Sequence, residues 1–264
     1  MESDKIYNMD GLESDKIYNM DCLEGMRRIP TASIDAIICD LPYGTTRNQW
    51  DSVIPLDKLW AEYRRIIKER GAIVLFAQQP FTSALVMSNP QMFKYEWIWE
   101  KESGTGHLNA NYCPMKIHEN VLVFSKSAAC FVKNPTDAMI YNPQMRQGFE
   151  PYRCKSGEGS SNYDGQVQVL TENNGERYPL NLLKFDRDKD AWHPTQKPVD
   201  LLRYLIRTYS NEGDTILDNC MGSGTTAVAC IKEKRHFIGF ELNKEYFDKA
   251  CKRIDAERRQ LSLF

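Results

Sequence analysis

The sequence predicts an α/β fold with a mostly parallel sheet that carries helices on both faces. Two observations lead to this prediction. Continuous apolar runs rich in β-branched residues, such as those at 34–40 and 71–77, are typical of strands buried on both faces. Segments with helical periodicity alternate with these runs, and such alternation is typical of strands joined by crossover helices.

The first half of the chain supplies four of the expected strands and two helices before its texture changes. A helix is expected to start at Cys22, followed by a strand at 34–40, a helix over 56–68 and a strand at 71–77. Further strands are expected at 94–101 and 119–126, where aromatic and β-branched residues cluster.

The pattern resumes near residue 193. The helix expected after Pro198 places apolar residues on one side, namely Val199, Leu202, Leu205 and Ile206. The remaining elements are a strand at 215–220, a helix from Gly224, a strand at 236–242 and a final helix.

Two segments interrupt this alternation. The sequence ESDKIYNMD occurs at 2–10 and again at 13–21, and only the second copy continues into the first expected helix. We therefore interpret residues 1–12 as a duplicated extension rather than as part of a repeat fold. Residues 133–192 are rich in Pro, Gly, Asn, Ser and Tyr, with little periodicity. So long an irregular segment is typical of a functional insertion or of disorder.

Composition restricts the class of protein. With 264 residues, of which 42% are hydrophobic and 27% charged, the chain can form a full core. No apolar run approaches the roughly 20 residues of a membrane helix, and no signal-peptide layout opens the chain, so we expect a cytoplasmic location without membrane contact. Eight cysteines without short paired spacing predict reduced, mostly buried thiols. A net charge of −2 means that any nucleic-acid contact needs a local basic surface.

The expected strand at 215–220 leads into a candidate nucleoside-cofactor site. It carries Asp218 and continues into the glycine-rich turn at 221–226, while Glu241 near the end of the next strand is well placed to bind ribose hydroxyls. The glycine pattern alone is weak evidence. However, Asp218 would repel a pyrophosphate and suits a ligand with a cationic amine and a sulfonium, which favours a methyl donor over NAD.

A second constellation, Asp40-Leu41-Pro42-Tyr43, lies at the carboxyl end of the strand at 34–40, where open α/β sheets bind ligands. The exocyclic amine of a base is a poor nucleophile because its lone pair is delocalised into the ring. The Asp40 carboxylate and the Leu41 carbonyl would accept its two hydrogens, while Pro42 stiffens the turn and Tyr43 stacks on an extruded base. Such a transfer depends on orientation and proximity, and we expect no metal.

These residues and their order resemble the amino-methyltransferases of DNA, in the permuted arrangement in which the catalytic tetrad precedes the cofactor loop. The resemblance covers nearly the whole chain after the duplication. It implies a Rossmann-like methyltransferase fold, S-adenosylmethionine as cofactor, double-stranded DNA as partner and a bacterial or phage-encoded enzyme. The family's tetrad is usually Asp-Pro-Pro-Tyr, and Leu41 is tolerable because its position acts through the carbonyl. Asp40 favours adenine N6, since the cytosine-N4 enzymes usually carry Ser there.

The resemblance also implies a division of labour along the chain. Residues 13–132 would form the catalytic half, 133–192 a target-recognition insertion and 193–264 the cofactor-binding half. Asp21 is similar to the carboxylate that contacts the donor's adenine, and His193–Pro198 to the signature beside its methionine moiety. The expected cofactor-binding residues are Asp21, Cys22, Asp40, Lys197, Pro198, Asp218, Cys220, Gly222, Ser223, Gly224, Thr225, Thr226, Glu241 and Leu242.

Several alternatives stay open at this point. The activity could instead be cytosine-N4 methylation, an inactive DNA-binding subunit with the same fold, or NAD-dependent oxidoreduction. Segments 97–101 and 118–119 resemble the walls of a target-base pocket, or are a buried aromatic strand and a loop pair. Basic residues of the insertion would contact DNA or form a solvated loop surface, namely Lys133, Arg146, Arg153, Lys155, Arg177 and Lys184. A homodimer and a companion restriction endonuclease are compatible with the sequence, which does not specify the DNA site.

Overall fold

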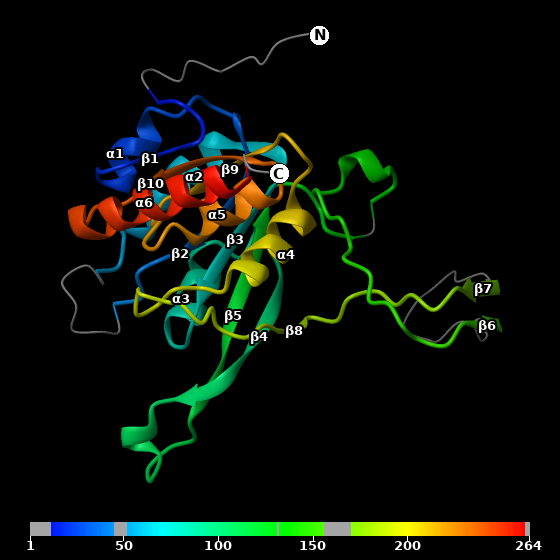
Figure 1. Ribbon diagram of the computed structural model, residues 1–264. Coiled ribbons are helices and arrows are strands. Elements are labelled where there is room, and N and C mark those ends of the chain that lie inside the picture. Colours follow the sequence, from blue (N-terminus) through cyan, green and yellow to red (C-terminus); the bar gives the residue numbers. More distant parts are fainter. Residues whose placement is uncertain (1–11, 45–51, 131, 156–169, 262–264) are drawn as a thin grey trace. The chain divides into compact units, whose positions relative to one another are not determined.

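An eight-stranded sheet forms the centre of the main compact unit, which comprises the described residues between 12 and 142 and between 181 and 261 (Figure 1). The computed structural model describes residues 12–44, 52–130, 132–155 and 170–261. The strand order is β1-β10-β9-β2-β3-β5-β4-β8. The strands are β1 Lys16–Tyr18, β2 Ile34–Asp40, β3 Ile67–Ala77, β4 Phe93–Thr105, β5 Lys116–Ser125, β8 Leu182–Lys184, β9 Thr215–Asp218 and β10 His236–Phe240.

The sheet is mostly parallel, as predicted. Among its described strands, β5 alone is antiparallel to its neighbours, β3 and β4. All other neighbouring pairs run parallel, including β2 with both β3 and β9. The apolar run of β2 is buried on both faces from Ile34 to Cys39, which explains its lack of polar alternation.

Helices cover both faces of the sheet and create two hydrophobic cores. One core joins the sheet to α1 Cys22–Arg27, α2 Leu56–Ile66 and α3 Phe81–Ser88. The other joins it to α4 Val199–Tyr209, α5 Thr225–Lys232 and α6 Lys244–Leu261. In the described ranges, no helix combines the length and the apolar character needed to cross a membrane.

Amphipathic spacing explains why these segments are helices. In α2, Leu59, Trp60, Tyr63 and Ile66 are buried along one stripe, while Asp57 in the first turn and arginines in the last turn complement the helix dipole. In α4, the stripe expected from the sequence packs on the opposite face of the sheet, and Pro198 precedes the first helical residue.

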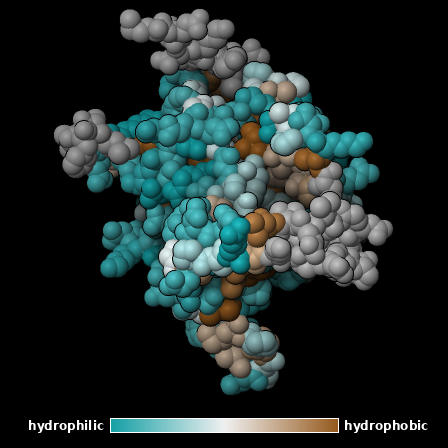
Figure 2. Space-filling model, turned by 90° about the vertical axis from the view of Figure 1, so that its right-hand side faces the viewer, coloured by the Kyte–Doolittle hydropathy of each residue, from teal (hydrophilic) through white to brown (hydrophobic). Residues whose placement is uncertain are grey.

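Some elements differ from the expectation. Helix α2 ends at Ile66, two residues early, because the chain enters β3 directly at Ile67. Strand β1 and helix α3 were not predicted, since segments of three and eight residues carry too little periodicity. Strands β4 and β5 extend beyond the expected bounds as a long hairpin. Leu108 and Tyr112, which lie between these two strands, are exposed. Figure 2 shows pale brown and teal surface on the part that projects at the bottom of the view.

The predicted insertion contains a second compact unit, Pro143–Leu180, which is narrower than the range 133–192. Within it, β6 Tyr152–Lys155 pairs antiparallel with β7 Leu170–Asn173. The Arg177 guanidinium lies 4.6 Å from the ring centroid of Tyr152 and 5.3 Å from that of Phe149. Residues 182–184, which the sequence assigned to the insertion, form β8 and pair with β4 in the main sheet.

Only the second copy of the duplicated segment lies within the described residues. Its first copy lies outside the described residues. Its second copy contributes β1 and then Asp21, whose carboxylate caps α1 by accepting hydrogen bonds from the Leu23 and Glu24 amides.

Adjacent strands β2 and β9 mark the place where the chain direction across the sheet reverses. From β2 the chain continues to β3 on one side, and from β9 it continues to β10 on the other. In open α/β sheets a ligand crevice forms outside the carboxyl ends of the strands at such a point. A ligand site is therefore expected among the residues that follow β2 and β9.

The contact between α1 and β10 provides a stability test of this arrangement. A methyl group added at Gly25 would overlap the buried ring of Phe240. Although alanine favours a helix over glycine, the overlap outweighs this gain, and we expect Gly25→Ala to lower the free energy of unfolding by about 1–2 kcal/mol. Urea denaturation measures the change. The exposed neighbour Glu24→Ala is the control and should stay within about 0.5 kcal/mol. Equal stability of Gly25→Ala and wild type would contradict the packing described.

Candidate active site

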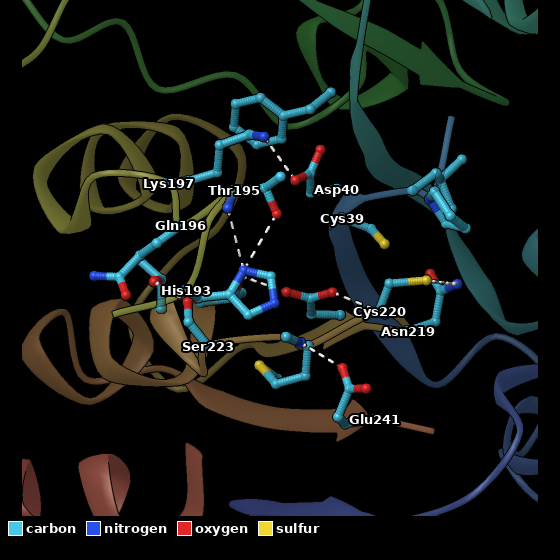
Figure 3. Close-up of a pocket in the computed structure, with 18 of the residues that line it drawn as sticks. Cys39, Asp40, His193, Thr195, Gln196, Lys197, Asn219, Cys220, Ser223 and Glu241 are labelled. Carbon is cyan, nitrogen blue, oxygen red and sulfur yellow. Dashed lines mark hydrogen bonds and ion pairs between the residues drawn. The ribbon is translucent and has the colours of Figure 1, made fainter. Parts of the chain in front are cut away.

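A pocket of about 420 Å³ opens at the carboxyl ends of the parallel strands (Figure 3). Its wall contains Asp40 from the end of β2, Gly222 from the loop after β9, Glu241 from the segment after β10 and Asp21 from the segment after β1. The two constellations expected to face one cleft therefore do so.

Strand direction explains why distant segments meet here. Parallel strands place their carboxyl ends at one edge, whereas the antiparallel β5 brings its amino-terminal half to that edge. In the register between β4 and β5, Trp99 lies opposite Glu119. Lys101 follows on β4, and all three side chains line the pocket.

The turn after β2 is held by a hydrogen bond within the tetrad. The Tyr43 hydroxyl donates to Asp40 Oδ1 at 2.6 Å, and the Tyr43 ring stacks on Phe81 at 5.4 Å between centroids. Burial and the Asp40 carboxylate raise the pKa of Tyr43 well above its usual value, so the hydroxyl remains a donor. Leu41 and Pro42 complete this part of the pocket wall.

A chain of alternating charges crosses the pocket from Asp40. Lys197 Nζ lies 2.6 Å from Asp40 Oδ2 and 3.1 Å from Glu119 Oε2, and Lys101 Nζ lies 2.8 Å from Glu119 Oε1. The two lysine side chains are only 9% and 4% exposed, so solvent screens these ion pairs weakly. The Lys197 ammonium also lies 5.0 Å from the ring centroid of Phe76.

Each group in this chain shifts the protonation of its neighbours. Burial raises the pKa of Asp40, the Lys197 ammonium opposes this rise, and the Glu119 carboxylate adds to it. Burial would also raise the pKa of Glu119, but the ammonium groups of Lys197 and Lys101 outweigh it and lower the pKa to about 2. Burial lowers the pKa of Lys197, whereas the carboxylates of Asp40 and Glu119 reverse that effect and raise it.

The loop after β9 is shaped by two glycines with positive φ. Gly222 has φ 51°, and its amide donates to Glu241 Oε2 at 2.8 Å. Gly224 has φ 78° and precedes α5, where an added Cβ would lie 3.2 Å from Ala250. The other Glu241 oxygen accepts from the Asn243 amide at 2.7 Å, so this carboxylate joins the loop to the end of β10.

The Asp218 carboxylate forms hydrogen bonds with the loop that follows it, which the sequence did not indicate. Its carboxylate accepts from the Thr226 hydroxyl at 2.6 Å and from the Cys220 amide at 3.1 Å. Burial raises the pKa of Asp218 to about 6, against these hydrogen bonds. The residue lines the pocket, but its described hydrogen bonds stabilise the loop.

The segment His193–Pro198 forms another wall of the pocket. The His193 ring packs on Tyr246 at 4.4 Å between centroids, and its Nδ1 lies 3.2 Å from the Thr195 hydroxyl (Figure 3). Burial, with a smaller effect of the Lys197 charge, lowers the pKa of His193 to about 4. The imidazole is therefore neutral near pH 7. Lys197, which the sequence placed among the cofactor-binding residues, lines the pocket and contacts Asp40 and Glu119.

Most of the predicted site residues line the pocket. Pro198 and Gly224 are not part of the wall. They are the residues directly before helices α4 and α5. Those in the wall are Asp21, Cys22, Asp40, Leu41, Pro42, Tyr43, Lys197, Asp218, Cys220, Gly222, Ser223, Thr225, Thr226, Glu241 and Leu242.

Other pocket residues were missed from the sequence. Asn219 follows Asp218 at a strand end and was therefore detectable by position, and it accepts a hydrogen bond from Tyr63 on α2 at 2.5 Å. Phe76 and Tyr246 carry no local signal, because an apolar strand residue and a helix aromatic are usually core. Asn19, which follows β1 and is not part of the pocket wall, supports this edge of the site, because its side-chain amide donates to the carbonyls of Glu241 and Leu242 at 2.8 and 3.0 Å.

The sequence of this chain is similar to those of known DNA methyltransferases. The chain is similar to the DNA adenine methyltransferase YhdJ of Escherichia coli (strain K12), with 28% identity over 246 residues that cover 87% of this chain and 79% of the relative. It is similar to the Type II methyltransferase M.HpaI of Haemophilus parainfluenzae, with 29% identity over 252 residues that cover 89% and 72% of the two chains.

Solved structures share the fold. The M1.HpyAVI-SAM complex matches with a TM-score of 0.58 and 25% identity, covering 90% of this chain and 98% of that chain. The cytosine-N4-specific PvuII DNA methyltransferase matches with a TM-score of 0.65 over 90% of this chain and 85% of its own, and at 16% identity this shows the fold alone.

The family model described as DNA methylase, N6_N4_Mtase, matches residues 34–252, a range that contains both the Asp40 turn and the glycine loop. This chain belongs to that family of DNA methylases.

Proposed function

We propose that this DNA methyltransferase transfers a methyl group from S-adenosylmethionine to the N6 amine of adenine. The observation that carries the proposal is the shared pocket of the Asp40 turn and the glycine loop at 221–226. The choice of adenine rests on Asp40 at the first tetrad position, and a relative named as a DNA adenine methyltransferase supports it.

The pocket has a volume and a charge that suit this cofactor. Its volume of about 420 Å³ lies in the range of small-molecule sites. Five carboxylates line it against three basic side chains, an excess that favours a cation. The carboxylates are Asp21, Asp40, Glu119, Asp218 and Glu241, and the basic groups are Lys101, Arg187 and Lys197. When bound, S-adenosylmethionine supplies a methyl group on a positively charged sulfur.

The residues of this chain would divide the work as follows. Glu241 would accept the ribose hydroxyls, and Asp21 would face the donor's adenine ring. Asp40 and the Leu41 carbonyl would accept the two amine hydrogens of the target base and turn its lone pair toward the methyl group. Tyr43 would stack on the extruded base while its hydroxyl keeps Asp40 oriented. Positive charge that develops on the amine would lie beside the Asp40 carboxylate.

The second compact unit would recognise DNA. Its surface exposes Tyr178 and the Arg153–Glu172 pair, whose side chains are 69% and 62% exposed. Arg146 and Arg177 instead donate to carbonyls within the unit and so support its fold. A homodimer and a companion restriction endonuclease stay predictions.

Asp40→Ala tests the proposed reaction. We expect the variant to lose methyl transfer by about a hundredfold or more, because the amine is no longer oriented, while it still binds the cofactor. Tritium transfer to unmethylated plasmid DNA measures the rate, and calorimetry measures cofactor binding. Mass spectrometry of nucleosides from the wild-type reaction should show N6-methyladenine. Detection of N4-methylcytosine instead, or a normal rate in Asp40→Ala, would refute the assignment.

Glu241→Ala tests the cofactor site. Loss of a carboxylate that accepts hydrogen bonds should raise the dissociation constant for S-adenosylmethionine by about tenfold or more. The matched control is Glu245→Ala, which removes an exposed carboxylate from the first turn of α6. If the two variants bound the cofactor equally well, Glu241 would have no role in binding.

Arg153→Ala tests DNA contact by the second unit. We expect severalfold weaker DNA binding and a salt dependence whose slope is smaller by about 1, because one phosphate contact is lost. Fluorescence anisotropy at several salt concentrations measures both. Lys234→Ala is the control, since this exposed lysine lies just before β10, at the sheet edge opposite the pocket. An unchanged slope in Arg153→Ala would place the DNA surface elsewhere.

A further inference from the structure

Both oxygens of the Asp40 carboxylate are hydrogen bonded within the protein. Oδ1 accepts from the Tyr43 hydroxyl and Oδ2 accepts from Lys197 Nζ, each at 2.6 Å. The proposed function needs this carboxylate to be ionised, oriented and able to accept a hydrogen from the target amine. The contact with Lys197 therefore bears directly on the reaction.

Lys197 resembles the target amine in its hydrogen bonding. Both donate an N–H hydrogen bond to a carboxylate oxygen. The Lys197 ammonium therefore occupies a hydrogen-bonding position on Asp40 that the target amine also requires. The ammonium has a second carboxylate within reach, because Glu119 Oε2 lies 3.1 Å from Nζ. It could therefore weaken one contact and remain paired in a buried site.

Neighbouring residues hold the Glu119 carboxylate where it can retain the Lys197 ammonium. Lys101 Nζ holds the other oxygen of Glu119 at 2.8 Å, which fixes the Glu119 carboxylate. Phe76 packs against the Lys197 ammonium. Two carboxylates alternate with two ammonium groups, so the chain is electrically balanced before a base enters.

We propose that Lys197 is a positioning residue that orients Asp40 before the target base enters and then yields its hydrogen bond to the target amine, while Glu119 retains the ammonium. This inference rests on the proposed function, and it adds Lys197 and Glu119 to the machinery that prepares the acceptor. No covalent step is involved, because one hydrogen bond to Oδ2 replaces another.

Titratable groups approach Asp40 from its own turn and from the elements packed against it. Tyr43 approaches from the same turn, Lys197 from the loop before α4, Glu119 from β5 and Asp218 from β9. Cys39 adjoins on β2, and burial raises its thiol pKa to about 12, so it stays neutral. Among these five described groups, Lys197 alone supplies a positive charge.

The acid limb of the pH–rate profile measures the role of Lys197. A protonated Asp40 has lost the charge that makes it a strong hydrogen-bond acceptor, so the rate falls as pH decreases through the Asp40 pKa, which burial raises. Lys197→Met removes the opposing charge and should move this limb to higher pH by about one pH unit or more. Glu119→Gln removes a negative charge near Asp40, and Lys197 then forms an ion pair with Asp40 alone. The acid limb should therefore move to lower pH.

Lys101→Met is the matched control. It removes a lysine of similar burial that contacts Glu119 but has no described contact with Asp40. Single-turnover transfer to unmethylated plasmid DNA at saturating S-adenosylmethionine gives each profile, and calorimetry at each pH confirms cofactor binding. Opposite shifts in Lys197→Met and Glu119→Gln, with a smaller shift in Lys101→Met, would support the proposal.

Other results would overturn it. An unmoved limb in Lys197→Met, or an equal shift in Lys101→Met, would show that direct contact with Asp40 is unimportant. If Lys197→Met fails to fold, Glu119→Gln decides alone, and a limb that stays or rises contradicts the proposal. Failure of the proposed function is distinguishable, because Asp40→Ala would then keep its activity or wild type would methylate another base.

Discussion

Parallel pairing of β2 with β9 is the constraint on which the site depends. Strands that run the same way end at the same edge, so the turn after Asp40 and the glycine loop after Asp218 become neighbours although 178 positions separate these two aspartates in the chain (218 − 40). The connections that leave these strands diverge to opposite sides, and the crevice between them becomes the pocket.

Antiparallel β5 adds the chemistry that parallel strands could not supply at this edge. Because it runs the other way, residues near its start lie beside the carboxyl ends of β3 and β4. Glu119 thereby reaches Lys197 and Lys101 inside the protein. Buried carboxylates and ammonium groups are costly alone, and here each has a partner of opposite charge. This mutual dependence links Asp40 to β4, β5 and the loop before α4.

The sequence determined the fold class and most of the pocket wall by itself. The run at 34–40 predicted a strand buried on both faces, and the glycines at 222 and 224 indicated a turn whose backbone can approach a ligand closely. Asp40, the following turn and Glu241 were recognisable because strand ends are where such sheets bind ligands. These signals are local, so they can be read along the chain.

Tertiary structure alone decided which charges meet. The sequence did not indicate that the Lys197 ammonium contacts Asp40 and Glu119, or that the Asp218 carboxylate accepts a hydrogen bond from Thr226 in its own loop. The short β1 and β8 became strands only because β10 and β4 offered free edges to pair with. Such outcomes depend on register, strand direction and burial across segments far apart in the chain, and a residue's own neighbours do not encode them.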